Sequence, residues 1–240
     1  MERHICRINH IELRALVPGK IETVILPVGT IEAHGITPLA TDMLIPNALA
    51  ERLAPEIGAL IAPAVPYGIT KGLYGHPGTV FITPQVFKAY VADVIASLAK
   101  TGFDKIVVLN GHGGQITELQ DACFEASKTS SVKTLLINWW MGMEDICRKE
   151  LEREGGHAGA DETAAVMAID PGLVKRELYD EKMILRQTGF FRAYPFPTPM
   201  ITYAEGDARL NLDEAKCRAY FNAVTARLLA AIKEILAKWE

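Results

Sequence analysis

Residues 23–46 read TVILPVGTIEAHGITPLATDMLIP and combine an apolar run, a polar loop and the expected start of a helix. The run over 23–29 is rich in Val, Ile and Leu without polar alternation, which is typical of a strand buried on both faces. Pro46 suits the first turn of a helix, which we predict over 46–57. A buried strand that leads through one loop to a helix is the repeating unit of a parallel sheet.

The same alternation continues along the chain. We predict further strands at 60–66, 105–110 and 134–140, and helices at 84–101, 115–128, 141–153, 161–169 and 213–239. Such alternation requires crossover connections, so the sequence predicts an α/β fold, a three-layer α/β/α sandwich with a mostly parallel central sheet. No repeat, low-complexity tract or linker interrupts the pattern, so residues 1–240 are predicted to form a single domain.

The composition of the chain limits the kinds of molecule that it can bind. Of its 240 residues, 49% are hydrophobic and 22% are charged, as in soluble globular proteins. A net charge of −4 offers no basic surface for nucleic acid, and no apolar run approaches the roughly 18 residues of a membrane span. The four cysteines lie far apart, as reduced cytosolic thiols do. We therefore expect a cytoplasmic protein that acts on a small molecule and binds neither nucleic acid nor membrane.

Polar side chains follow the first predicted strand. Glu32 and His34 are two residues apart, so in extended backbone they project from one face, and Asp42 follows in the same loop. Loops at the carboxyl ends of parallel strands converge on one crevice, and one imidazole with two carboxylates suits Zn²⁺, Mn²⁺ or Fe²⁺. The alternative is structural: His34 as a hydrogen-bonded turn residue and Asp42 as the cap of the helix that starts near Pro46.

A second polar turn, Asn110-Gly111-His112-Gly113-Gly114, follows the strand predicted at 105–110. Its glycines permit a tight turn and close backbone approach to a ligand, and the turn leads into a helix N-terminus. A phosphate-binding loop is the competing interpretation, but the turn lacks the third glycine of G-x-G-x-x-G and the lysine of a P-loop. His112 is therefore expected to face the same crevice as Glu32 and His34.

The third segment contains His157 and Glu162. His157 lies between the Gly155-Gly156 pair and Gly159 and belongs to no apolar stripe, so a role as acid or base is favoured. Glu162 falls in the first turn of the helix predicted at 161–169, where the helix dipole favours a carboxylate for structural reasons as well.

Taken together, these segments resemble the creatininase (creatinine amidohydrolase) family. The resemblance rests on 26–46, on NGHGG at 110–114, on HAGADET at 157–163 and on the loop YGHPGT at 74–79. It implies a divalent metal-dependent hydrolase that acts on a C–N bond, with Zn, Mn or Fe as the metal and a homo-oligomer, a dimer or hexamer, as the assembly.

The family's metal ligands map onto this chain residue by residue. The resemblance implies that Glu32, His34, Asp42 and His112 bind metal. In creatininase proper the histidine of the second motif is followed by a tyrosine and a metal-binding glutamate, whereas Gly113 and Gly114 stand here. This form resembles a broader branch of the family that includes deformylases and a peptidase, and it moves the expected substrate from creatinine toward another small amide. Glu162 is then the candidate for the missing carboxylate, as ligand or as general base.

The expected reaction is hydrolysis of a cyclic amide or formamide. Asp42 would bridge two divalent ions, one held by Glu32 and His112, and the other by His34 with Glu162. A metal-activated hydroxide would attack the carbonyl carbon, and His157 would carry a proton to the leaving nitrogen. The N–H groups of the 111–114 turn would stabilise the oxyanion.

The remaining candidates concern the substrate. We expect His76, Gly113, Gly114 and Trp140 to contact it, Trp139 to pack in the core, and Lys71, Arg186 or Arg192 to be available for an anionic group; His4 and His10 are expected on the surface without partners. The alternatives are a peptidase, lactonase or phosphoesterase with the same ligands, and a non-catalytic metal-binding oligomer.

Overall fold

The computed structural model describes residues 1–187, 191–203 and 212–239. Its strands are β1 (Thr23–Val28), β2 (Leu60–Ile61), β3 (Lys105–Asn110), β4 (Lys133–Asn138), β5 (Gly156–His157), β6 (Ile184–Arg186) and β7 (Met200–Thr202). Its α-helices are α1 (His10–Leu16), α2 (Thr41–Glu56), α3 (Pro84–Thr101), α4 (Ile116–Ser130), α5 (Glu144–Leu151), α6 (Ala160–Ile169) and α7 (Glu214–Lys238). Five short 3-10 helices lie at Ile5–Arg7, Gly113–Gln115, Pro171–Leu173, Arg176–Leu178 and Glu181–Met183 in this part of the chain.

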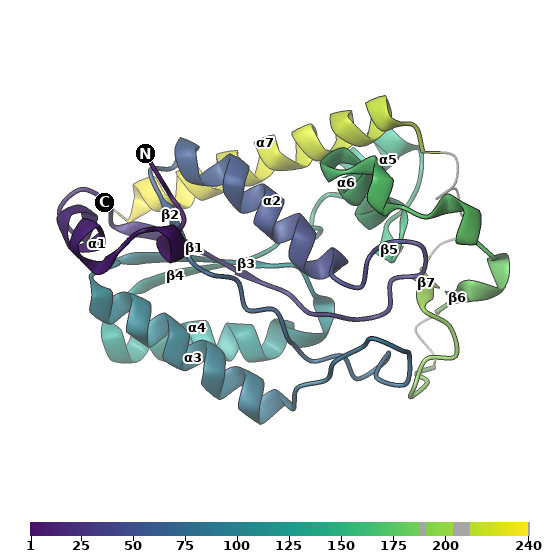
Figure 1. Cartoon of the computed structure of the whole chain (residues 1–240), viewed down its shortest axis with the longest axis horizontal. Coiled ribbons are helices and arrows are strands. Elements are labelled where there is room, and N and C mark those ends of the chain that lie inside the picture. Colours follow the sequence, from purple (N-terminus) through teal and green to yellow (C-terminus); the bar gives the residue numbers. More distant parts are fainter. Residues whose placement is uncertain (188–190, 204–211, 240) are drawn as a thin grey trace.

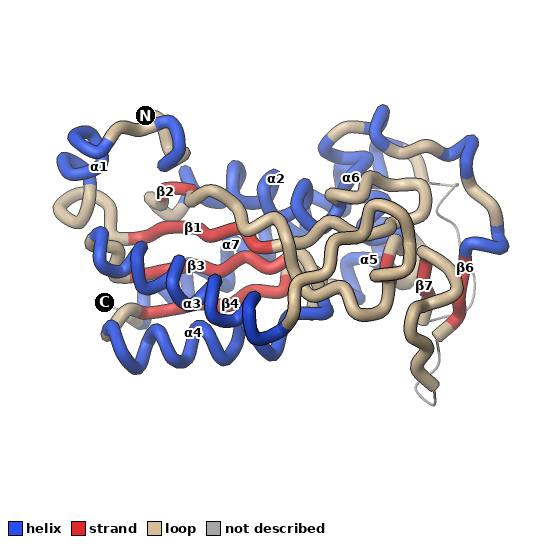
Figure 2. Tube along the Cα trace, turned by 60° about the horizontal axis from the view of Figure 1, so that its bottom comes forward, coloured by secondary structure: helices blue, strands red, loops and turns tan. Residues whose placement is uncertain are grey.

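The central sheet has the order β2-β1-β3-β4, and all its pairs are parallel. Val28, Asn110 and Asn138 are aligned across β1, β3 and β4, so the carboxyl ends of these strands share one edge. The predicted parallel sheet between two helical layers is confirmed (Figure 1). This edge faces the second, smaller sheet, β5-β7-β6 (Figure 2).

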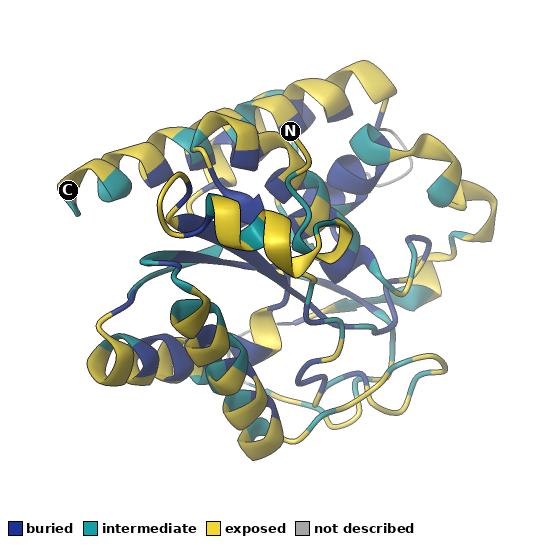
Figure 3. Cartoon of the chain, turned by 60° about the vertical axis from the view of Figure 1, so that its left-hand side comes forward, coloured by how far each residue is buried: buried dark blue, intermediate teal, exposed yellow. Residues whose placement is uncertain are grey.

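Alternate residues of the central strands enter two cores. Ile25 and Val107 pack with α2, α6 and α7, whereas Val24 and Ile106 pack with α3 and α4. The sheet is therefore covered on both faces, and the outward faces of the helices are exposed (Figure 3). This burial explains why the strands lack the polar alternation of a half-exposed sheet.

Several predicted boundaries were wrong. Helix α2 begins at Thr41, so Pro46 lies inside the helix instead of in its first turn. Strand β2 ends at Ile61 because Pro63 and Pro66 lack the N–H that a longer ladder needs. The three strands of the small sheet were not predicted. His4 is not without a partner, since its Nε2 lies 2.6 Å from Glu51 Oε1.

Other predicted elements agree closely with the structure. The strand 105–110 and the helix 84–101 have the predicted bounds. Asp213 caps α7, as its position suggests, by accepting a hydrogen bond from the N–H of Lys216. No helix in the described ranges combines the length and apolar character needed to cross a bilayer.

Candidate metal centre and active site

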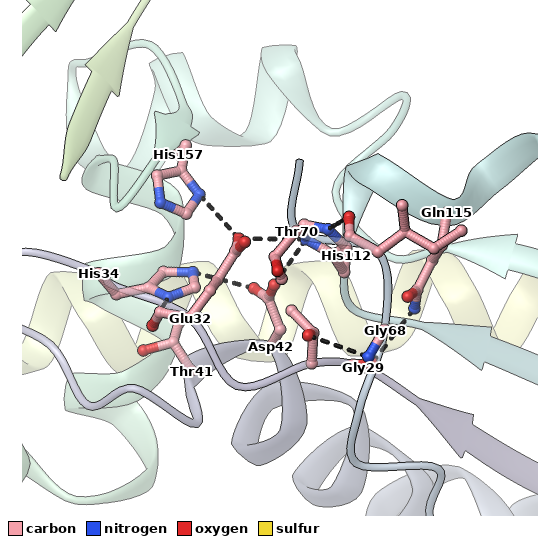
Figure 4. A network of polar contacts seen from close by, with 12 residues as sticks. Gly29, Glu32, His34, Thr41, Asp42, Gly68, Thr70, His112, Gln115 and His157 are labelled. Carbon is pink, nitrogen blue, oxygen red and sulfur yellow. Dashed lines mark hydrogen bonds and ion pairs between the residues drawn. The ribbon is translucent and has the colours of Figure 1, made fainter. Parts of the chain in front are cut away.

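The loops that leave the aligned ends of β1 and β3 bring the first two motifs together. Glu32 and His34 lie in the loop after β1, and His112 lies in the turn after β3. Asp42 belongs to the first turn of α2, not to the loop as predicted, and it does not cap the helix. Its carboxylate points between the two imidazoles (Figure 4).

Asp42 links two groups of side chains. Its Oδ1 lies 3.0 Å from His34 Nε2, and its Oδ2 lies 2.9 Å from His112 Nδ1. Glu32 Oε1 is 3.2 Å from His112 Nδ1, and Glu162 Oε2 is 3.7 Å from His34 Nε2. Two triads therefore share Asp42, and the candidate ligand atoms within each triad lie within 4.8 Å of one another.

Backbone carbonyls fix both imidazole rings. His112 Nε2 lies 2.8 Å from the carbonyl oxygen of Ile69, and His34 Nδ1 lies 3.0 Å from that of Glu32. A carbonyl only accepts, so these two nitrogens carry hydrogen and donate. In the neutral rings, the other nitrogens present lone pairs to the carboxylate oxygens. Lone pairs that face carboxylate oxygens repel them, so this arrangement is stable only when a cation or an additional proton lies between each imidazole nitrogen and the carboxylate.

The pKa values follow from this concentration of charge. Burial alone would lower the pKa of His34, but the charge and hydrogen bond of Asp42 outweigh it and raise the pKa to about 10. The pKa of His112 is likewise raised against the effect of burial, by Glu32 and Asp42. Burial would raise the pKa of Asp42, yet His34 and His112 hold it well below its usual value. The Asp42 carboxylate therefore stays charged and attracts cations.

His157 approaches the same centre from β5. Its Nε2 lies 2.9 Å from the carbonyl oxygen of Ala33, so this nitrogen donates, and Nδ1 lies 3.5 Å from Glu32 Oε1. The His157 ring lies against that of His34, with 4.3 Å between centroids. Burial, followed by the charge of His34, lowers the pKa of His157 to about 4. The ring is therefore neutral at pH 7 and presents the Nδ1 lone pair toward the centre.

Glu162 lies in the first turn of α6, where the sequence placed it. Its Oε2 accepts a 2.6 Å hydrogen bond from the N–H of Ala158, which has a left-handed φ of 52°. Burial raises the pKa of Glu162 well above its usual value, although His34 acts in the opposite direction. A cation near His34 would favour the ionised form of this carboxyl.

Asn110 supports the His112 turn and was not recognised as a functional residue from the sequence. Its Oδ1 accepts from the His112 N–H at 3.0 Å, and its Nδ2 donates to the His112 carbonyl at 2.8 Å. Gln115 Nε2 also donates to Asn110 Oδ1, at 3.0 Å. A fully buried asparagine at the end of a buried strand was the available signal, because such a side chain needs hydrogen-bond partners.

Two adjacent glycines of this turn differ sharply in the space around them. A Cβ on Gly114 would lie 2.5 Å from His112 Nε2 and would collide with the Ile69 carbonyl oxygen. A Cβ on Gly113 would meet only Trp140 Cζ2, at 3.7 Å. The hydrogen bond that orients His112 therefore needs a glycine at position 114.

A cavity of about 690 Å³ lies beside the centre. Its lining includes Gly113, Gly114 and Trp140 among the predicted substrate contacts, while Trp139 is fully buried in the core. His76 does not line the cavity, because its Nε2 lies 2.8 Å from the Phe196 carbonyl oxygen and the ring is used to hold a lining segment.

Lysine and arginine also reach this cavity. Lys71 and Arg192 are among its lining residues, whereas Arg186 is not. The predicted cationic side chains are thus divided between the cavity wall and the rest of the surface.

The family model described as "Creatininase: Creatinine amidohydrolase" matches residues 7–232. The chain belongs to the creatininase family. The predicted family is confirmed.

Curated relatives carry several hydrolase names. A 3-dehydro-scyllo-inosose hydrolase of Thermotoga maritima is 31% identical over 65% of this chain and 53% of its own length. Creatinine amidohydrolase of Pseudomonas putida is 30% identical, over 68% of this chain and 70% of its own. A mycofactocin precursor peptide peptidase of Mycolicibacterium smegmatis is 35% identical, over 46% of each chain. The alignment thus spans about half of the Thermotoga protein.

Solved structures of creatininases share the fold. A mutant creatininase complexed with creatine superposes with a TM-score of 0.85 at 22% identity and 98% coverage of both chains. A structure titled "Creatininase Mn" gives a TM-score of 0.81 at 23% identity, also with 98% coverage of both. The match over nearly the whole chain agrees with the predicted three-layer architecture.

Proposed function

We propose that the protein is a metal-dependent amidohydrolase that cleaves a C–N bond of a small molecule. One observation carries the proposal: two triads, buried except for the partly exposed Glu162, share Asp42, and in each of them an imidazole nitrogen faces carboxylate oxygens while its other nitrogen donates to a carbonyl. Carbonyl-bound imidazoles that point at carboxylates are the usual surroundings of a metal ion. The side chains therefore fit two divalent cations.

The two positions share Asp42 and differ in their other ligands. Glu32, Asp42 and His112 would hold one ion, and His34, Asp42 and Glu162 the other. This set of imidazoles and carboxylates suits Zn²⁺, Mn²⁺ or Fe²⁺. When bound, such ions polarise a substrate carbonyl and lower the pKa of water from about 15.7 toward roughly 7.

His157 is the proposed proton carrier. The Ala33 carbonyl fixes its tautomer, so Nδ1 can accept a proton at the centre and return it to the leaving nitrogen. In the 111–114 turn, the N–H of Gly111 already bonds the Val28 carbonyl and that of His112 bonds Asn110. The N–H groups of Gly113 and Gly114 are thus the candidates for contacting a developing oxyanion.

The proposed substrate is a small amide other than creatinine. A cavity of about 690 Å³ suits a small molecule. The Pseudomonas relative is named for creatinine, but Gly113 and Gly114 replace the side chains that creatininase proper carries at these positions. A peptide bond is the second candidate, because the mycofactocin precursor peptide peptidase is 35% identical over 118 residues.

The proposal is tested with purified, metal-loaded protein and a panel of lactams, formamides, lactones, short peptides and phosphoesters. Removal of metal by a chelator should abolish hydrolysis, and re-addition should restore it. His34→Ala should abolish hydrolysis too, whereas His10→Ala, at an exposed position on α1, should not. Activity that survives both chelation and His34→Ala would refute metal catalysis.

A further inference from the structure

Two basic side chains reach the cavity from different segments of the chain. Lys71 lies in the loop after β2, and Arg192 lies between β6 and β7; these are the lysine and the arginine of the described lining. Neither side chain has a hydrogen-bond or ion-pair partner among the residues that the structure describes. The metal centre does not use them. Their charges are therefore available to a ligand in the cavity.

The two segments that carry these cations pack against each other. The N–H of Phe196 donates to the Gly72 carbonyl at 2.6 Å, and His76 Nε2 lies 2.8 Å from the Phe196 carbonyl oxygen. A Cβ on Gly72 would collide with the Phe196 ring, so the ring lies directly against this loop. Lys71 precedes Gly72, and Arg192 lies four residues before Phe196. The packing therefore holds both cation-bearing segments at one border of the cavity.

Tyr203 adds a hydroxyl to this border. Strand β7 pairs antiparallel with β5, and Ile201 lies directly opposite His157. Opposite residues of an antiparallel pair share a face, as do residues two apart in one strand. Tyr203 therefore projects from the same face as Ile201 and His157, and all three line the cavity. Tyr203 is 59% exposed, and its hydroxyl has no partner among the described residues, so a ligand can reach it.

The charge of Arg192 acts on this hydroxyl. Burial, followed by the charge of Glu162, raises the pKa of Tyr203 above its usual value, whereas the charge of Arg192 opposes this rise. The hydroxyl is therefore neutral at pH 7 and can donate a hydrogen bond. The guanidinium is close enough to affect it electrostatically, so the two groups belong to the same part of the cavity.

Acidic residues that line the cavity outside the two triads come from another part of the chain, around α5 and α6. Arg148 Nη1 lies 3.2 Å from Glu154 Oε1, and Asp161 Oδ1 accepts a hydrogen bond from the Gly156 N–H at 3.0 Å. Glu144 lies in the first turn of α5, where the helix dipole favours a carboxylate. These carboxylates are stabilised by their own surroundings and do not neutralise the two cations.

We propose that Lys71, Arg192 and Tyr203 form a subsite for an anionic group of the substrate, a carboxylate or a phosphate, at the end away from the scissile bond. This inference rests on the proposed function and narrows its substrate class to amides that also carry an acidic group. A guanidinium can donate to two oxygens of such a group at once, and an ammonium supplies a second charge. An anion held there would position the amide at the metal centre.

The test uses malonamate, succinamate and glutaramate on the metal-loaded protein, each compared with its neutral diamide. The three lengths vary the distance between the amide and the carboxylate. Titration calorimetry measures binding, and kcat/KM replaces it where the amide is hydrolysed. The wild-type protein should prefer the anion to the diamide at one length or more. Arg192→Gln should reduce this preference about tenfold, the usual effect of losing a hydrogen bond between charged groups, and Lys71→Gln should reduce it too.

Control variants separate local recognition from net charge. Arg14→Gln on α1 and Lys100→Gln in the last turn of α3 each remove one positive charge from a residue that does not line the cavity, so the preference should not change. Tyr203→Phe should weaken binding of the anion and leave binding of the diamide as it is. Because the three subsite side chains have no partner among the described residues, their variants should keep the melting temperature of the wild type.

Direct binding of the carboxylate to the metal ions predicts a different result. The preference would then be unchanged in Arg192→Gln and in Lys71→Gln, which would overturn the subsite. Glycolamide phosphate, compared with glycolamide, tests the phosphate in the same way, and the acid whose binding falls more in these variants is the one recognised. Equal binding of every anion and its neutral counterpart by the wild type would also overturn the subsite.

Metal content measured on the same samples separates the two proposals. Full metal content and hydrolysis of neutral amides, without preference for any anion, overturn the subsite alone. A preference for anions that Arg192→Gln removes, in a protein that binds no metal, overturns the metal centre and supports the subsite.

Discussion

Gly114→Ala should weaken metal binding through the orientation of His112. The new Cβ would lie 2.5 Å from His112 Nε2, whereas ordinary contact begins at 3.4 Å, so the ring must move by about 0.9 Å, the difference between the two. The collision with the Ile69 carbonyl falls on the same hydrogen bond. Losing such a bond to a metal-binding histidine typically lowers metal affinity by about 10- to 100-fold.

The matched control is the neighbouring residue. In Gly113→Ala the new Cβ meets only Trp140 Cζ2 at 3.7 Å, an ordinary contact, so metal affinity should stay within about twofold of the wild type. Competition against a chromophoric chelator gives both dissociation constants, and far-UV circular dichroism checks folding. Wild-type affinity in Gly114→Ala, or an equal loss in both variants, would refute the reasoning.

Further predictions concern metal content, catalysis and stability. Glu162→Gln should lower the metal content per chain, measured by elemental analysis; unchanged stoichiometry would remove Glu162 from the ligands. His157→Asn should keep the metal but lose about 10²- to 10⁴-fold in hydrolysis rate, as expected for a proton carrier; full activity would contradict that role. Gly29→Ala should cost about 1–3 kcal/mol in urea unfolding, because its Cβ would collide with the Asp42 carbonyl, whereas Gly19→Ala has open space. In the metal-free protein the pKa of His34 rises from 6.5 to about 10 on folding. Its contribution to stability is therefore complete below pH 6.5 and lost as the pH rises toward 10, so urea unfolding of the chelated protein should show lower stability at pH 9 than at pH 6. Equal stability at the two pH values would contradict this.

The sequence predicted the elements whose signals are local. The run at 105–110 is apolar and ends at a polar glycine turn, so its bounds were predicted correctly. The predicted start of α2 was wrong because proline is common in the first turn of a helix, and Pro46 was therefore placed there. Inside the helix its missing N–H leaves the Asp42 carbonyl without the usual helical partner, and Gly111 packs against that carbonyl. β5 consists of two residues, too few for any periodic signal.

The candidate site, too, could be predicted only in part from the sequence. Glu32, His34 and His112 could be brought together from the sequence, because residues after parallel strands meet at one edge. The position of Asp42 between the two imidazoles depends on where α2 begins, which the sequence did not give correctly. The burial of Tyr220 depends on the tertiary packing of α7 against α5 and α6, which no local pattern encodes.

The proposed function requires two divalent ions, both held by Asp42. Anomalous diffraction from crystals of the metal-loaded protein, collected at the absorption edge of the metal, locates such ions directly. Two peaks per chain are expected, one between His112 Nδ1, Glu32 and Asp42 Oδ2, and the other between His34 Nε2, Asp42 Oδ1 and Glu162. Anomalous density that avoids Asp42, or none at all in metal-loaded crystals, would contradict the account.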